Sequence, residues 1–473
     1  MSHHAPPIVR ASAVFLVMVT GCVTEIGART DAAGASVDAH DLERDARAVD
    51  AGSSDAGVPF DAFSPDAFSL DGGGDAGSPD AGPRGPTLYP YETRHSPIDR
   101  TIADDLRAIA TSHPDRADDV FAKVGDSITV STAFLACFTG GTVDLDGREA
   151  LRPTIDHFRV GDAGGSDPFR RVSLAAGTGW SASRVLMGTP SPLTQELDAL
   201  APRFASLMYG TNDVGFVDVD SFGRNMTAIV DAMLAVGTIP ILSSIPPRDD
   251  DAAADRRVPL FNGIVRALAQ SRGLPFVDFH RELVPLAGHG LAGDGVHPQA
   301  SMGGCVLTDA GLRAGSNVRN LLVLEALDRL RRVVIEGEDA IEPSAPHLAG
   351  SGTMADPFVV TSLPFAAHLD TRTMGESRVD RWACGTADEG GAEVRFRFHL
   401  ASGASVTALV SSGAGADLDV HLAPSGSTSA CIARDNRQLD LDLAAGEFDL
   451  VIDTYRGASG PEAGEGLVVL VAR

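Results

Sequence analysis

The feature of this sequence that most constrains its fold is a regular alternation between short apolar runs and longer amphipathic segments. The apolar runs, which are typical of buried strands, are 120–124, 171–176, 204–209, 239–243 and 274–279. Amphipathic helices are predicted at 222–236, 260–270 and 318–334. Because strands that alternate with helices form a mostly parallel sheet covered on both faces, we expect an α/β fold between about Tyr89 and Ile335.

The pattern changes after about Pro343. Apolar residues then recur at every second position, as in 394–398, and glycine-containing turns separate the runs. Further strands are predicted at 405–410, 418–422 and 448–453. This part of the chain is expected to form a small antiparallel β-sandwich, so we place one domain at 89–342 and a second at 343–473.

The N-terminus has the pattern of an export signal. Basic residues precede an apolar run at 11–19 that is too short to span a bilayer. The run ends in Val19-Thr20-Gly21-Cys22, which resembles the lipobox of bacterial lipoproteins, whose cysteine is lipidated after signal cleavage. We therefore expect an exported protein, anchored through Cys22 to the outer membrane or cell surface. An ordinary secretory peptide that ends near a cysteine is the alternative.

The segment 23–88 is dominated by Asp, Ala, Gly, Ser and Pro, and near-repeats such as Ser-Pro-Asp-Ala occur in it. Such a composition buries little apolar surface, which predicts a disordered tether. The whole chain has 64 acidic and 38 basic residues and a net charge of -26. This charge excludes a general electrostatic affinity for nucleic acid.

Export places the remaining cysteines in an oxidising compartment, where an even number suggests disulfides. Pairing within domains favours Cys137 with Cys305 and Cys384 with Cys431 among the possible connectivities, and free buried thiols are the alternative. No CxxC pair or His/Cys cluster with metal-binding spacing occurs in the sequence. We therefore expect neither a structural metal nor a cofactor.

Polar motifs follow three of the predicted strands. Gly-Asp-Ser at 125–127 follows the first strand, Gly-Thr-Asn-Asp at 210–213 follows the third, and Asp-Gly-Val-His at 294–297 comes after the fifth. Each motif alone is more typical of a turn or helix cap. Since ligands bind at the carboxyl ends of strands in open α/β sheets, the three together predict one site at that edge.

These residue types suit nucleophilic catalysis. A serine hydroxyl needs an imidazole to take its proton, and the imidazole needs a carboxylate to fix its tautomer. Ser127, His297 and Asp294 can supply these groups, because an offset of three residues lets Asp294 fold back onto the ring. Activity is then expected to rise between about pH 6 and 7 as His297 loses its proton.

The motifs resemble those of the SGNH/GDSL hydrolase superfamily over about 115–335. The resemblance implies a flavodoxin-like three-layer α/β/α domain, with Ser127 as nucleophile and the Asp294/His297 pair as its activating partners. It also implies an oxyanion hole made by the backbone N–H of Ser127, a glycine N–H and the side-chain amide of Asn212. Gly179 is preferred for the glycine, and Gly177 is the alternative.

Three neighbours of this expected site have supporting roles. Asp213 and Thr211 are expected to bond backbone amides and so to shape the Asn212 loop. Trp180 is expected either to wall a substrate pocket or to cap the core. The G-x-S-x-G motif of the α/β-hydrolases does not occur around Ser127, which disfavours that fold.

The C-terminal part, about 350–473, resembles the bacterial pre-peptidase C-terminal β-sandwich, an accessory module of many secreted enzymes. The resemblance rests on short motifs such as Arg-Trp-Ala-Cys at 381–384 and Asp-Leu-Asp-Val at 417–420. Asp417 and Asp419 are able to bind calcium, but strand alternation favours a solvated strand face for both.

Together these features predict a secreted, lipid-anchored serine esterase. Its substrate is expected to be an extracellular ester of a carbohydrate or a lipid, including O-acetyl groups, short-chain esters, lysophospholipids and thioesters. The alternative is a non-catalytic surface module that binds glycan or protein on the same scaffold.

Overall fold

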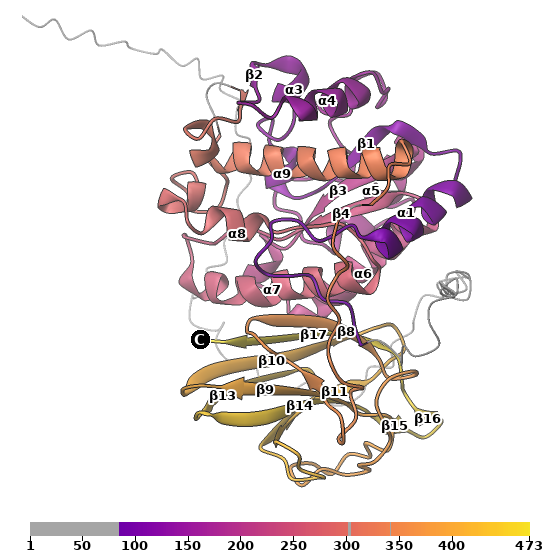
Figure 1. The fold of residues 1–473 in the computed structure, drawn as a ribbon, viewed down its shortest axis with the longest axis vertical. Coiled ribbons are helices and arrows are strands. Elements are labelled where there is room, and N and C mark those ends of the chain that lie inside the picture. The colour runs from indigo at the N-terminus through magenta and orange to yellow at the C-terminus, as the bar shows by residue number, and fades with distance from the viewer. Residues whose placement is uncertain (1–84, 301–303, 341) are drawn as a thin grey trace, which may run out of the picture. The chain divides into compact units, whose positions relative to one another are not determined.

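A four-stranded parallel sheet lies at the centre of the N-terminal part of the computed structural model, which describes residues 85–300, 304–340 and 342–473 (Figure 1). Its strands, in the order β1-β3-β4-β5, are β1 Ala117–Gly125, β3 Pro202–Met208, β4 Ile239–Ser243 and β5 Phe276–Val277. Every residue of β3 and β4 is buried. The predicted parallel sheet is confirmed, although β5 is shorter than expected.

The predicted strand at 171–176 is wrong. Only Ala176 pairs, as an isolated parallel bridge to Gly125 at the outer edge of β1. Before Ala176, the Glu196 side chain takes the place of a neighbouring strand as the bonding partner. It forms an ion pair with Arg171 at 2.9 Å and accepts the Leu174 N–H at 2.9 Å. Val172 is 84% exposed, so the apolar run has no second buried face.

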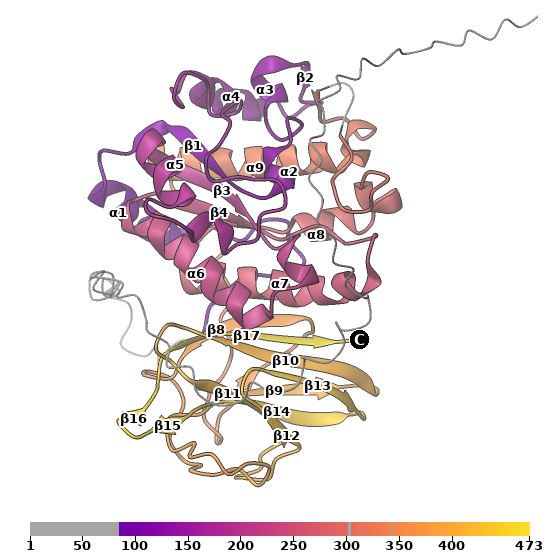
Figure 2. The same ribbon diagram turned by 180° about the vertical axis from the view of Figure 1, so that it is seen from behind.

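Helices cover both faces of the sheet (Figures 1 and 2). In the two opposite views, α1 and α9 lie on one side and α5 and α6 on the other, which is the expected α/β/α layering. The longer helices are α1 Arg100–Ser112, α4 Arg152–Arg159, α5 Pro192–Leu200, α6 Val219–Ala235, α7 Ala252–Ser271 and α9 Gly315–Leu330. The shorter ones are α2 Ser127–Val130, α3 Cys137–Gly140 and α8 Phe279–Leu283.

The described chain from residue 343 onward is all β and contains no helix. One sheet has the order β13-β10-β17-β8 and the other β12-β11-β14-β9-β7. The strands are β7 Phe358–Val359, β8 Phe365–Asp370, β9 Val394–Leu400, β10 Ala404–Ser412, β11 Leu418–Pro424, β12 Ala433–Asp435, β13 Gln438–Leu443, β14 Gly446–Thr454 and β17 Glu465–Ala472. Alternate residues such as Val394, Phe396 and Phe398 fill the core between the sheets.

Two short strand pairs lie outside these sheets. β2 Val143–Asp144 pairs with β6 Cys305–Val306, and β15 Arg456–Gly457 pairs with β16 Gly460–Pro461. Both expected disulfides are present, Cys137 with Cys305 and Cys384 with Cys431.

Part of the outer face of the β11-β14-β9 sheet is covered. Trp382 and Val379, from the loop 371–393, pack there on Ala423 and Val451. The expectation of a solvated face is therefore wrong for Asp419, which is 2% exposed. The covering loop, which the strand pattern does not reveal, is the reason.

Residues 85–88, the last of the segment expected to be disordered, pair with residues 346–348 through the Leu88 N–H to Pro346 O (2.8 Å) and the Leu348 N–H to Pro86 O (2.9 Å). The signal segment, Cys22 and residues 23–84 lie outside the described residues. Among the helices that the structure describes, none combines the length and the apolar character needed for a membrane span.

Candidate active site

The turn after β1 presents Ser127 at the first position of α2. Asp126 caps this helix, since its Oδ1 accepts the Ile128 N–H at 3.0 Å. Burial raises the pKa of the Asp126 carboxyl above its usual value. Gly125 is required here because a Cβ would run into the Thr129 side chain and the Met208 carbonyl. The local sequence therefore fixes where the Ser127 hydroxyl lies.

A second turn brings an imidazole to that hydroxyl. His297 Nε2 lies 2.8 Å from Ser127 Oγ, and His297 Nδ1 lies 2.7 Å from Asp294 Oδ2. The turn itself needs Gly295, whose φ is +69°. The structure thus brings together the three side chains that the sequence singled out, although they come from distant parts of the chain.

Asp294 is held by the backbone of its own turn. Its Oδ1 accepts the N–H groups of Val296 and His297, both at 3.0 Å. Together with the bond to the imidazole, these donors lower the pKa of Asp294 to about 2. The carboxylate is therefore ionised at any pH near neutrality and faces the Nδ1 side of the ring.

The expected oxyanion donors lie on two loops that are bonded to each other. The Asn212 side-chain amide donates to the Trp180 carbonyl at 3.0 Å. The Gly177 N–H donates to the Gly125 carbonyl at 3.1 Å, so it is already used in the bridge beside β1. Gly179 has a φ of +74° and lies in the exposed turn between Gly177 and Trp180. This arrangement favours Gly179 over Gly177 as a donor to a bound ligand.

Asp213 also links the Asn212 loop to the Trp180 loop. It is fully buried, and its two carboxylate oxygens accept the Ala182 N–H at 2.9 and 3.2 Å. Burial is the main cause that raises its pKa to about 6. Asp213 does bond a backbone amide, as expected, but that amide belongs to the Trp180 loop. Trp180 is half-buried and packs against the core.

Arg248, which the sequence did not single out, supports the Asn212 loop. Its Nη1 donates to the Thr211 carbonyl at 2.5 Å, and Asp250 holds its guanidinium through two bonds of 2.7 and 2.8 Å. The next residue, Asp249, donates its N–H to the Gly295 carbonyl at 2.8 Å. Residues 248–250 therefore join the Asn212 loop to the His297 turn, although they read as a charged surface turn in the sequence.

Arg319 lies under the nucleophile helix and was also missed. It is 2% exposed, donates to Ile128 O at 2.8 Å and to Thr129 Oγ1 at 2.9 Å, and stacks over the ring of Phe134 at 3.7 Å. Burial lowers its pKa to about 9. The available signal was the pair Arg319 and Asn320 inside the otherwise apolar run 318–324.

A pocket of about 30 Å³ opens beside His297. Its lining residues are Ile128, Ser131, Phe134, His297, Pro298, Ser316 and Arg319. The space can hold about two water molecules, so it suits a small group.

Residues 124–302 match the model of the GDSL-like Lipase/Acylhydrolase family. The chain carries a GDSL-like acylhydrolase domain. The match includes the GDSL domain's serine turn, its Asn212 loop and its Asp294–His297 turn. This match supports a hydrolase role for the matched domain, acting on esters. No curated protein matches the chain.

Solved structures similar to parts of the chain have low identity to it. A GDSL-like lipase from Bacteroides thetaiotaomicron is 16% identical and covers 48% of this chain and 98% of its own, with a TM-score of 0.31. A carbohydrate esterase family 3 protein from Talaromyces cellulolyticus is 19% identical and covers 44% and 98%, with a TM-score of 0.30. The pre-peptidase C-terminal domain of a Bacillus anthracis collagenase is 14% identical and covers 24% and 91%, with a TM-score of 0.17.

Proposed function

We propose that this protein is an exported, lipid-anchored serine esterase that uses Ser127, His297 and Asp294 as its catalytic triad. The observation that carries the proposal is the continuous hydrogen-bonded line from Ser127 Oγ through the His297 ring to Asp294, with links of 2.8 and 2.7 Å. These are the contacts that general-base activation of a serine requires.

In the first step, Ser127 Oγ attacks the ester carbonyl carbon while His297 Nε2 takes its proton. The tetrahedral oxyanion is stabilised by the N–H groups of Ser127 and Gly179 and by the amide of Asn212. His297 then gives the proton to the departing alcohol, which leaves an acyl-Ser127 ester. In the second step, His297 deprotonates a water molecule, which attacks that ester, and the acid product leaves with Ser127 restored.

The proposed substrate is an ester with a small acyl group, carried by a carbohydrate or a lipid outside the cytoplasm. The small pocket beside His297 supports the small acyl group. The side chains of His297 and Asp294 are 42% and 51% exposed, so the site is open to an ester with a large alcohol part. The export signal and Cys22 support the extracytoplasmic location.

A fluorophosphonate probe tests the nucleophile, because it reacts covalently with an activated serine. Wild-type protein is expected to be labelled, Ser127→Ala to be unlabelled, and Ser112→Ala, an exposed serine on α1, to be labelled like wild type. Labelling that is absent, or that persists in Ser127→Ala, would reject the triad. Absence in a folded protein would favour the alternative of a glycan- or protein-binding module.

Substrate choice is tested with chromogenic esters of graded acyl length and with acetylated xylan. We expect kcat/KM to be highest for acetyl esters and to fall as the acyl chain grows, because added methylenes do not fit the pocket. A maximum at long chains would reject the small-acyl proposal while leaving the triad in place.

A further inference from the structure

A second cluster of functional groups lies in the β-sandwich. His421 and Asp419 on β11 and Asp453 on β14 lie on the outer face of their sheet, and Glu389 comes from the loop that covers it. Asp419 is opposite Asp453 in the strand register. All four residues are at most 2% exposed, so this is an interior polar site.

His421 is the unusual member of the cluster. It is fully buried, and neither of its ring nitrogens has a hydrogen-bond partner among the described residues. Its ring stacks on Trp382 with centroids 4.8 Å apart and an interplanar angle of 26°, which fixes the plane of the imidazole. Buried polar atoms without a hydrogen-bond partner destabilise the folded state, so a group that binds these nitrogens is expected.

The carboxylates are placed to share that group with His421. One donor atom each from Glu389, His421 and Asp453 lies within 4.8 Å of the others. The Glu389 Oε1 to His421 Nε2 distance is 3.8 Å. Donors bound to one tetrahedral zinc ion at about 2.0–2.2 Å lie about 3.3–3.6 Å apart, so the Glu389–His421 pair must close by a few tenths of an ångström and the third donor by up to about 1.5 Å.

Of the three carboxylates beside His421, two have a basic partner among the described residues and one does not. Arg434 contacts Glu389 at 3.1 Å and Asp419 at 2.7 Å. In contrast, no lysine or arginine within the described parts of the chain forms an ion pair with Asp453. Asp453 instead accepts hydrogen bonds from the Trp382 indole N–H at 2.6 Å and from the Thr454 N–H at 2.8 Å, and a metal ion would supply the positive charge that these neutral donors lack.

We propose that Glu389, His421 and Asp453 bind a divalent transition-metal cation, Zn²⁺ foremost. An imidazole nitrogen with carboxylate oxygens suits Zn²⁺, whereas Ca²⁺ and Mg²⁺ prefer all-oxygen sites. The cation would join the covering loop to β11 and β14 and thus have a structural role. No sequence motif indicates this site, because its ligands are far apart along the chain.

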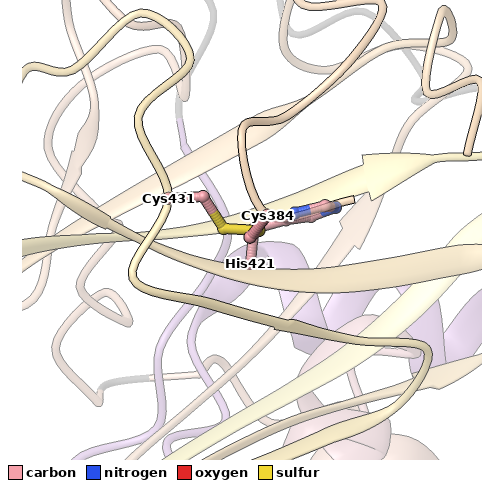
Figure 3. A group of neighbouring side chains, drawn as sticks. All are labelled: Cys384, His421 and Cys431. Atoms are coloured by element: carbon pink, nitrogen blue, oxygen red, sulfur yellow. A yellow bond between two sulfur atoms is a disulfide. The ribbon is translucent and has the colours of Figure 1, made fainter. Parts of the chain in front are cut away.

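A different set of ligands around His421 is excluded by the covalent structure. Cys384 and Cys431 lie next to its ring, but their sulfur atoms are joined in a disulfide (Figure 3). Only a thiolate is a good zinc ligand, so the oxidised pair does not contribute. Experiments on this site must therefore omit reducing agents, which would create a second, thiolate-containing site.

The test uses the full chain, expressed without a histidine tag, stripped with a chelator and dialysed without reductant. We expect titration with Zn²⁺ to reach about one ion per chain by elemental analysis and to raise the midpoint of thermal unfolding, because a ligand that binds only the folded state stabilises it. Ca²⁺ at the same concentration is expected to do neither. Failure of the oxidised wild type to bind Zn²⁺ in this stoichiometry would overturn the proposal.

Variants assign the binding to these residues. His421→Gln is expected to lose Zn²⁺ binding, and the matched control His399→Gln, at an exposed position on β9, is expected to keep it. Asp453→Asn, which preserves the side-chain shape, is expected to weaken binding at least tenfold. Unchanged binding in a folded His421→Gln or Asp453→Asn protein would reject the assignment.

If both variants fail to fold, spectroscopy of the wild type tests which ligands bind the metal ion. Co²⁺ in place of Zn²⁺ is expected to show d–d bands without a thiolate-to-cobalt charge-transfer band. A charge-transfer band, or no Co²⁺ spectrum at all, would contradict a site built from Glu389, His421 and Asp453.

Discussion

Both carboxylate oxygens of Asp294 are bonded to the residue that Asp294 orients. Oδ2 lies 2.7 Å from the His297 ring, and Oδ1 accepts the His297 backbone N–H at 3.0 Å. The side chain therefore sets both the rotamer and the tautomer of the imidazole, even though the pair is open to solvent. Orientation, and not a strong buried charge, is the contribution that we expect from Asp294.

Replacing Asp294 by Asn is expected to lower kcat for an acetyl ester by about 10²–10⁴-fold, because an amide N–H favours the wrong imidazole tautomer. Initial-rate kinetics on 4-nitrophenyl acetate measure the effect. Asp309→Asn, at an exposed position, serves as a control and should retain wild-type kinetics. Near wild-type kcat in Asp294→Asn would show that the carboxylate does not orient His297.

Asp213 is expected to make folding stability depend on pH. Its pKa is raised from 3.8 to about 6 by burial, so the folded state binds more protons than the unfolded state between these values. Stability contributed by the protonated form is therefore lost as the pH rises from about 4 to about 6, by up to about 3 kcal/mol.

Asp213→Asn should remove that dependence. Urea unfolding of wild type and variant at about pH 4 and pH 7 measures it, and the variant is expected to gain stability relative to wild type at the higher pH. Parallel profiles for the two proteins would mean that Asp213 does not titrate in this range.

At the scale of elements, the two disulfides close loops of different length. Cys137 with Cys305 joins α3 to β6 across 168 residues, whereas Cys384 with Cys431 ties the covering loop of the sandwich across 47. The first is supported by Asn320 of α9, which accepts the Leu135 N–H at 2.8 Å and donates to the Ala133 carbonyl at 2.9 Å. Both should restrict the unfolded chain.

Removing Cys137 and Cys305 together by substitution with Ala is expected to lower the free energy of unfolding by about 3–5 kcal/mol. Removing Cys384 and Cys431 should cost about 1 kcal/mol less, because the closed loop is shorter. Urea titrations of the two double variants and the wild type, all without reductant, provide the comparison. A larger loss for the shorter loop would show that loop closure does not dominate.

At the scale of the whole described chain, the described residues from 85 onward belong to one compact unit, in which helices α6 and α7 pack on β8, β10 and β17. The buried Asp220 of α6 accepts a hydrogen bond from Ser411 and pairs with Arg437 at 3.0 Å. In α7, Gly263 lets the sheet approach, since a Cβ there would lie 2.6 Å from Val469 Cγ1. The GDSL domain and the sandwich are therefore expected to unfold together.

Gly263→Val is expected to destabilise the protein by about 1–3 kcal/mol through overpacking and to separate unfolding into two transitions. Differential scanning calorimetry resolves one transition from two. Gly140→Ala makes a suitable control, because a Cβ at Gly140 would have only ordinary contact, 3.5 Å from Arg170. A single, unshifted transition in Gly263→Val would argue against this coupling.

The sequence alone determined what depends on local pattern. Apolar periodicity located three of the four sheet strands closely, together with helices α6, α7 and α9 and the sandwich strands β9, β10, β11 and β14. The turns after the strands placed Ser127, Asn212 and His297 at one edge. These predictions succeed because side-chain periodicity and glycine-dependent turns act over a few residues.

Tertiary structure alone decided what depends on partners far along the chain. The run 171–176 does not pair as a strand, because Glu196 binds its polar groups instead. Arg319 is a buried support for the serine turn. The loop 371–393 buries Asp419 and His421. Whether a polar residue is solvated, paired or placed near a metal ion depends on what covers it. That covering is fixed by packing between elements, which no local pattern records.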